Sequence, residues 1–249
     1  MSVPTHADVL PGTWNFRDIG GIPTSAGPVR HGVVYRSANL AQLDPSGLDG
    51  LEKLGVTDVF DLRGQQEIGR DGADRVPGSV TVTVAPFHPE GDEIPVHEAQ
   101  EGAAPRSQAD RIRAYYAAIP VLQPAQRSVA ALLTTVADGP GPVLVHCAAG
   151  KDRTGWAIAT LLTVSGADRD AVLADYLLSN TAIESLRTWM QAQYGDAFLA
   201  DDGILGVHPS YLQAAWDSVA ENFGSFDGYL AEIGIGQDVV QGVRRRLLG

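Results

Sequence analysis

One stretch of the chain combines a sulfur nucleophile, a guanidinium and a glycine-containing turn at close spacing. It reads His146-Cys147-Ala148-Ala149-Gly150-Lys151-Asp152-Arg153-Thr154-Gly155, after the apolar run 142–145 and before the uncharged run 156–166. This pattern predicts a strand, a tight loop and a helix. Backbone N–H groups and the positive end of a helix dipole converge in such a loop, which therefore predicts a site for a phosphate-sized anion.

Cys147 and Arg153 give this loop its chemistry. A helix N-terminus and neighbouring cations can lower a cysteine pKa from about 8.5 to about 3.5–7.5, and the thiolate is the nucleophilic form. Arg153 offers a planar fork of donors that can hold two phosphoryl oxygens at once. The pair therefore predicts a loop that binds a phosphoryl group and attacks it. The alternative is an inert buried cysteine in a strand-to-helix turn.

The stretch from His146 to Thr154 resembles the H-C-x5-R-[S/T] signature of the cysteine-dependent protein tyrosine phosphatases. Its full form is similar to a bacterial branch that includes phosphoinositide-active members. Four further stretches resemble this family in the same order, namely 15–21, 61–63, 175–180 and 224–230. The likeness spans nearly the whole chain. It implies an α/β fold, with a central, mostly parallel sheet flanked by helices and a helical C-terminal region, in one domain over 1–249.

Several roles follow from this resemblance. Cys147 forms a phosphocysteine while Arg153 and the loop amides hold the phosphoryl oxygens. The chain has no Trp-Pro-Asp sequence, from which many tyrosine phosphatases take their acid. In the bacterial branch an aspartate inside the loop protonates the leaving group, and Asp152 matches it. The remaining loop residues are expected to bind substrate or shape the loop: Ala148, Ala149, Gly150, Lys151, Thr154 and His146. The family counterpart of Lys151 suggests contact with additional phosphates of an inositol ring.

Two pairs of charged residues outside the loop could support it. Asp61 and Arg63 end a predicted strand over 56–62, and ligands of open parallel sheets bind beyond the carboxyl ends of strands. Asp61 is therefore an alternative general acid, with a plain ion pair as the competing interpretation. Arg17 and Asp18 could brace the loop from behind or simply hold a turn.

Composition limits the class of partner. The 249 residues are 44% hydrophobic, enough for one substantial core. A net charge of -12 argues against a nucleic-acid partner or an anionic membrane surface. The one cysteine cannot form an intrachain disulfide, and no apolar run approaches the length of a membrane span. We expect a cytoplasmic protein, or one secreted without a recognisable signal peptide, that acts on phosphoproteins or phosphoinositides. The oligomeric state is left open.

Residues 85–109 interrupt the alternation of strands and helices. They contain four prolines and two glycines, and a connection of this length is typical of a lid, a binding loop or a disordered insertion. His88 and His97 lie within it, without the spacing of a metal site. The sequence therefore predicts neither a metal nor another cofactor.

Local patterns predict the remaining elements. Asp44-Pro45 starts a helix that Gly55 ends, and the alternating run 80–84 predicts a half-buried strand. Helices are expected to begin at Asp110, at Pro124, at Thr181 and at His208-Pro209. One more helix follows Asp168 as its cap, and two others are expected over 226–233 and 238–248. Tyr115 and Tyr116 are expected in the core or a pocket wall. Arg244, Arg245 and Arg246 are interpreted as solvated charge at the end of the last helix.

The sequence thus predicts hydrolysis of phosphate monoesters through Cys147. Phosphotyrosine is the first expected substrate, with phosphoserine, phosphothreonine or phosphoinositides as further ones. A rhodanese-like sulfurtransferase or an arsenate reductase also uses a cysteine in an anion-binding loop, but Arg153-Thr154 and the absence of a second cysteine count against both. A non-catalytic phosphate-binding module is the third possibility.

Overall fold

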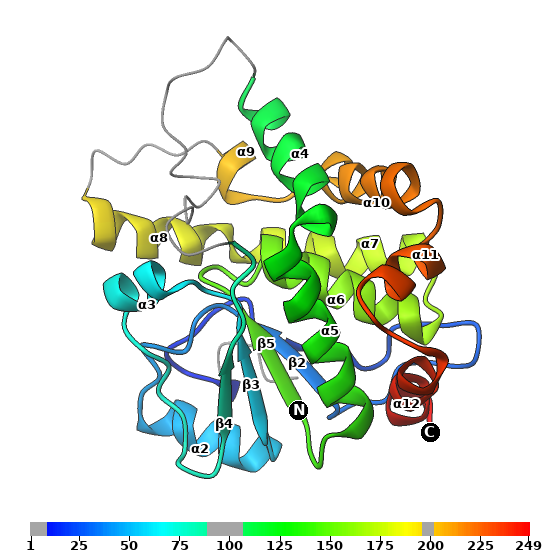
Figure 1. Ribbon diagram of the computed structural model, residues 1–249. Helices are drawn as coiled ribbons and strands as arrows, with labels where there is room; N and C mark the ends of the chain where they lie inside the picture. Colours follow the sequence, from blue (N-terminus) through cyan, green and yellow to red (C-terminus); the bar gives the residue numbers. More distant parts are fainter. Residues whose placement is uncertain (1–8, 89–106, 196–201) are drawn as a thin grey trace.

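The computed structural model describes residues 9–88, 107–195 and 202–249 (Figure 1). In these residues a five-stranded sheet has the strand order β1-β2-β5-β3-β4. Strands β2, β5, β3 and β4 are parallel, and only β1 runs antiparallel, as a hairpin with β2. The predicted mostly parallel sheet is confirmed. The strands are β1 (Arg17–Asp18), β2 (Val34–Ser37), β3 (Asp58–Asp61), β4 (Thr81–Val84) and β5 (Val143–His146).

Helices cover both faces of the sheet, and the C-terminal half of the described chain is helical (Figure 1). The helices are α2 (Pro45–Leu54), α3 (Gln65–Asp71), α4 (Gln108–Ala118), α5 (Gln123–Asp138), α6 (Asp152–Ser165), α7 (Arg169–Leu177), α8 (Ile183–Tyr194), α9 (Asp202–Leu205), α10 (Pro209–Phe223), α11 (Phe226–Glu232) and α12 (Gln237–Leu248), with 3-10 turns at Ile119–Val121 and Leu178–Ala182. None of the helices in the described residues is both long and apolar enough to span a bilayer.

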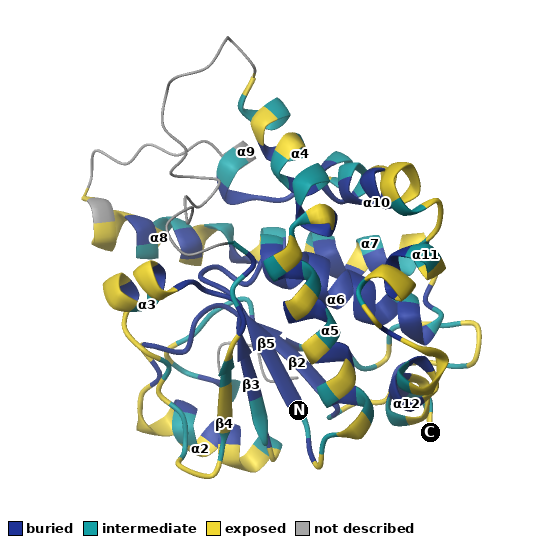
Figure 2. Cartoon of the chain, viewed as in Figure 1, coloured by how far each residue is buried: buried dark blue, intermediate teal, exposed yellow. Residues whose placement is uncertain are grey.

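Side chains of the central strands alternate between two cores, because successive strand residues point to opposite faces. Val59 and Leu144 join a smaller core with Leu51 of α2. Phe60 and Val145 join the larger core, which also takes in residues of α4, α5, α6, α10 and α12. The buried strands and the inward faces of these helices form the dark interior of Figure 2. A strand buried on both faces is rigid, and β5 is such a strand.

The predicted loop follows β5 and lies at the edge of the sheet where the parallel strands end. Its last residue, His146, pairs with Ser37 of β2 and Asp61 of β3. Helix α6 follows the loop and is buried along most of its length, with Trp156 fully inside. The loop is therefore held between a central strand and a core helix.

Three local predictions are confirmed and others need correction. Asp44, Asp168 and His208 cap α2, α7 and α10 as expected. Helix α4 starts at Gln108 and not at Asp110, because Ser107 is the cap and Asp110 completes its capping box. Thr181 lies in a 3-10 turn before α8.

The prediction of a half-buried strand over 80–84 is wrong in its burial. The strand forms, but Val82 and Val84 are 36% and 41% exposed. Strand side chains point to the two faces of the sheet, so those of the edge strand β4 are buried only where another element packs across that edge. The alternating pattern indicates the strand and not which of its residues are covered.

Two of the three C-terminal arginines, which were predicted to be solvated surface charges, form hydrogen bonds to other elements of the fold. Arg244 donates to the carbonyl of Val164 at the end of α6, and Arg246 donates to that of Gly141 before β5. They tie α12 to the two elements that carry the loop. The insertion predicted over 85–109 lies largely outside the described residues, which resume at position 107.

Candidate active site

The loop from Cys147 to Arg153 turns back sharply at Gly150. Gly150 has φ +68, in the left-handed region that favours glycine, and a Cβ there would lie 2.1 Å from the carbonyl oxygen of Ser37. A larger residue would therefore push the loop away from the end of β2. The glycine predicted as part of the loop is needed for its shape.

Neighbouring elements hold three successive loop carbonyls from outside. Asn39 donates to Ala148 through its side chain and its backbone, at 3.2 and 3.1 Å. Asn15 donates to the carbonyls of Ala149 and Gly150, at 3.2 and 2.9 Å. In a trans peptide the carbonyl and the following N–H point in opposite directions. Carbonyls held outward thus turn the N–H groups of residues 149–151 toward the centre of the loop.

A buried ion network stands behind these contacts. Arg36 donates to the Gly150 carbonyl at 2.8 Å and to Asp175 at 2.6 Å. Arg17 donates to the other Asp175 oxygen at 2.7 Å and to the Asn15 side chain at 2.6 Å. Arg17 therefore supports the loop from behind, which was one of the two alternatives predicted for Arg17 and Asp18. Asp18 instead holds a turn, accepting from the backbone of Gly20 and Gly32.

Cys147 is 2% exposed at the base of this loop. Burial alone would also fit an inert cysteine, so the surrounding polar groups decide between the two interpretations. In the described part of the chain, no protein acceptor bonds the N–H groups of Ala148 to Lys151. The hydroxyl of Thr154 is likewise buried without a partner there. Unpaired donors in a buried loop are costly unless an anion takes them, which favours the phosphate-binding interpretation.

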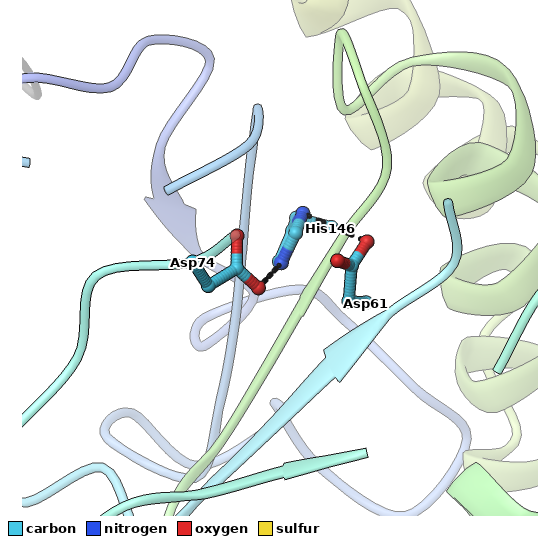
Figure 3. A group of neighbouring side chains, drawn as sticks. All are labelled: Asp61, Asp74 and His146. Carbon is cyan, nitrogen blue, oxygen red and sulfur yellow. Dashed lines mark hydrogen bonds and ion pairs between the residues drawn. The ribbon is translucent and has the colours of Figure 1, made fainter. Parts of the chain in front are cut away.

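His146, directly before Cys147, carries a positive charge. Its Nε2 lies 2.7 Å from an Asp74 carboxylate oxygen (Figure 3). Its Nδ1 lies 3.2 Å from the Cys147 carbonyl oxygen. Both partners only accept, so both ring nitrogens must donate. Burial would lower the pKa of His146, but the charges of Asp61 and Asp74 raise it above its ordinary value. A cation thus lies immediately under the loop.

Asp61 and Arg63 form an ion pair beneath the loop. Arg63 donates to both Asp61 oxygens, at 2.8 to 3.1 Å, and also to Asp74 at 2.8 Å. Asp61, Asp74 and His146 bring ligand atoms within 4.8 Å of one another (Figure 3), but the cations already occupy these carboxylates. The cluster is therefore an ion-pair network and not a free set of metal ligands. With its carboxylate engaged this way, Asp61 is a weaker candidate for the general acid than Asp152.

Arg153 is fixed by a carboxylate that the sequence did not single out. Its two terminal nitrogens donate to the two oxygens of Glu67 in α3, at 2.5 and 2.6 Å. Burial would raise the pKa of Glu67, but the Arg153 charge lowers it to about 2. In turn Glu67, and to a smaller extent Cys147, raises the pKa of Arg153 well above its ordinary value against the effect of burial. The Nε–H and one terminal N–H of Arg153 have no acceptor among the described residues and can grip two oxygens.

Asp152 and Lys151 open helix α6 at the rim of the loop. One oxygen of Asp152 accepts from the hydroxyl of Tyr116 at 2.7 Å. The Lys151 ammonium donates to the carbonyls of Ile204 and Gly206 and lies 3.7 Å from the second Asp152 oxygen. In this structure Lys151 is therefore bound to backbone carbonyls in α9 and just after it, where a phosphate contact had been predicted.

Sequence reasoning missed most of the supporting residues. Glu67 carried only a weak signal: its carboxylate accepts from the backbone N–H of Gly64 at the start of α3, but Gly64 has no side chain to complete a capping box. Tyr116 was predicted only as core or wall, and it also reaches the candidate acid. Arg36 and Asp74 had no local pattern that pointed to the loop, and Asn15 lay in the stretch 15–21, which only the family resemblance singled out.

Comparisons with known proteins agree with this geometry. Residues 9–249 match the model of the tyrosine phosphatase family. The chain is 38% identical to the triple specificity protein phosphatase PtpB of Mycobacterium tuberculosis, across 96% of this chain and 98% of the relative. It is 33% identical to a Cupriavidus necator protein whose name places it among the tyrosine-protein phosphatases, across 88% of this chain and 80% of that protein. Because the match covers nearly the whole sequence, the chain belongs to the tyrosine phosphatase family.

Proposed function

We propose that this tyrosine phosphatase hydrolyses phosphate monoesters through a phosphocysteine formed on Cys147. The observation that carries the proposal is the pairing of Arg153 with Glu67 beside a cysteine whose loop turns its amides inward. This arrangement is fixed before substrate arrives. Preorganised donors of this kind stabilise the charge that develops on a transferring phosphoryl group.

The proposed reaction has two steps. In the first, the Cys147 thiolate forms a bond to phosphorus as the bond to the leaving oxygen breaks, and Asp152 gives that oxygen its proton. In the second, water attacks the phosphocysteine, Asp152 takes a proton from it, and phosphate and the thiolate are released. Arg153 and the N–H groups of the loop hold the equatorial oxygens throughout, while Thr154 has a free hydroxyl for the thiolate. Each step uses only groups of this chain, its substrate and water.

The proposed substrates are phosphoproteins, with phosphotyrosine first, and phosphoserine, phosphothreonine or phosphoinositides beside it. Support comes from the relative in M. tuberculosis, which is named for triple specificity and aligns with 96% of this chain. We place the reaction in one domain over 1–249, in the cytoplasm or, if the protein is exported, outside the cell.

The test is the replacement Cys147→Ser, which keeps the shape of the loop and removes the sulfur. Turnover of p-nitrophenyl phosphate is expected to fall to background, while inorganic phosphate still binds, measured by calorimetry. The exposed-site variant Ser46→Ala in α2 is the control for handling and folding. Activity retained in Cys147→Ser would refute the covalent route.

A further inference from the structure

Two buried tyrosines form a chain of hydrogen bonds that ends on Asp152. The hydroxyl of Tyr176, in α7, lies 2.7 Å from the hydroxyl of Tyr116, in α4, which lies 2.7 Å from Asp152 Oδ1. The two tyrosines are 1% and 0% exposed. Neither takes part in the reaction steps proposed above, although Tyr116 bonds the group assigned as acid directly and Tyr176 is linked to it through Tyr116.

The fold makes room for this chain. A Cβ on Gly155, in the first turn of α6, would lie 3.0 Å from the ring of Tyr176. The missing side chain lets that ring lie against α6, close to where Asp152 begins the helix. Tyr116 meets Tyr176 edge-on, with ring centroids 6.1 Å apart. Phenylalanine would fill the same space, so packing alone does not explain the two hydroxyls.

The direction of the bonds follows from the chemistry of the groups. A carboxylate only accepts, so Tyr116 donates to Asp152, and its own oxygen accepts from Tyr176. Burial, and after it the charge of Asp152, raises the pKa of Tyr116 well above its ordinary value. Tyr116 therefore keeps its proton and acts as a fixed donor. The other oxygen of Asp152, Oδ2, lies 3.7 Å from the ammonium of Lys151, beyond hydrogen-bond distance.

We propose that Tyr116, held by Tyr176, is a positioning residue that fixes Asp152 Oδ1 and leaves Oδ2 to carry the proton to the leaving group. This inference rests on the proposed function. As Oδ2 gives up its proton, the carboxyl group becomes a carboxylate, and the hydrogen bond from Tyr116 becomes charge-assisted and stronger. An interaction that is stronger in the transition state than in the ground state lowers the activation barrier.

The test measures kcat/KM for a series of aryl phosphates whose leaving groups differ in basicity. Tyr116→Phe is expected to lose about tenfold or more with phenyl phosphate, and little with 2,4-dinitrophenyl phosphate, which needs no proton. The plot against leaving-group pKa becomes steeper. The matched control is Tyr229→Phe, which removes a buried hydroxyl from a ring packed on Trp156 and Phe223. Its slope is expected to equal that of the parent.

Two further variants separate positioning from a merely structural effect. In an Asp152→Asn background, Tyr116→Phe is expected to cause no further loss, because the acid it serves is gone. Tyr176→Phe is expected to steepen the plot less than Tyr116→Phe, and it serves as the test if Tyr116→Phe does not fold.

An unchanged slope in folded variants, or a loss equal across the series, would overturn the proposal. An additive loss in the Asp152→Asn background would do the same. The result for Cys147→Ser is independent of these outcomes, so failure of the positioning role and failure of the covalent route are distinguishable.

Discussion

Arg153 and Lys151 lie two residues apart in the same loop, yet the molecule holds them in different ways. Arg153 is paired with both oxygens of a buried carboxylate, Glu67, from helix α3. Lys151 is bonded to neutral backbone carbonyls of Ile204 and Gly206, and it lies 3.7 Å from a carboxylate oxygen of Asp152. Both side chains are buried.

The difference predicts that Arg153 is a fixed cation and that a ligand can recruit Lys151. A buried ion pair with two short hydrogen bonds is costly to break, because either partner alone is an uncompensated charge in the interior. Carbonyl contacts to an ammonium can be exchanged for contacts to a phosphate with less cost, since no second charge is left behind. Arg153 thus suits the phosphoryl group that every substrate presents, and Lys151 suits a second phosphate that only some present.

Removing the Glu67 carboxylate is expected to have the largest effect on the difference between Arg153 and Lys151. Glu67→Gln leaves Arg153 buried without its countercharge, so we expect about 3 kcal/mol less free energy of unfolding. We also expect a loss of about 10²-fold in kcat for p-nitrophenyl phosphate, because the guanidinium is no longer aimed. Denaturant unfolding and steady-state kinetics measure the two effects. Glu52→Gln, at an exposed position of α2, is the control, and equal behaviour of the two variants would contradict the role given to Glu67.

Lowering the pH tests the Glu67–Arg153 ion pair without a substitution in the loop. The pKa of Glu67 is lowered to about 2 in the folded protein from its ordinary 4.5, so its contribution to stability is fully present above about pH 4.5. That contribution, of about 3 kcal/mol, is lost as the pH falls toward 2. The gap in unfolding free energy between the parent and Glu67→Gln should therefore narrow over this range. A gap independent of pH would show that the pair does not stabilise the fold through charge.

Lys151→Ala gives the smallest effect with simple substrates. Turnover of p-nitrophenyl phosphate is expected to change by less than about threefold, because the loop amides and Arg153 still hold the phosphoryl group. Soluble inositol polyphosphates should bind about tenfold more weakly, as one charge-assisted contact to a second phosphate is lost. Lys53→Ala, on the exposed side of α2, is the matched control. An equal loss on both substrate classes would remove the distinction between Lys151 and Arg153.

Much of the fold follows from local chemistry in the sequence. A capping side chain acts within three residues, so Asp44, Asp168 and His208 were readable as helix starts. The mostly parallel sheet followed from the family resemblance and is confirmed. The exposure of Val82 and Val84 was not readable, because burial of an edge strand depends on which elements lie across it.

The candidate site divides in the same way. Cys147, Asp152 and Arg153 are set by spacing within a few residues, which a strand and the first turn of a helix convert directly into proximity. Their partners come from far along the chain: Glu67 is 86 residues from Arg153, and Tyr116 is 36 residues from Asp152. No sequence period links such positions.

The sequence by itself determined the candidate nucleophile, the candidate phosphate-binding cation and the kind of loop between them, because their chemistry and spacing are local. Only the tertiary structure decided which groups hold that loop: the network of Arg17, Arg36 and Asp175 behind it, the charged His146 beneath it and Glu67 on Arg153. The physical reason is that a buried charge or donor needs a partner, and that partner can be supplied by any segment that the packing of helices on the sheet brings within hydrogen-bond distance.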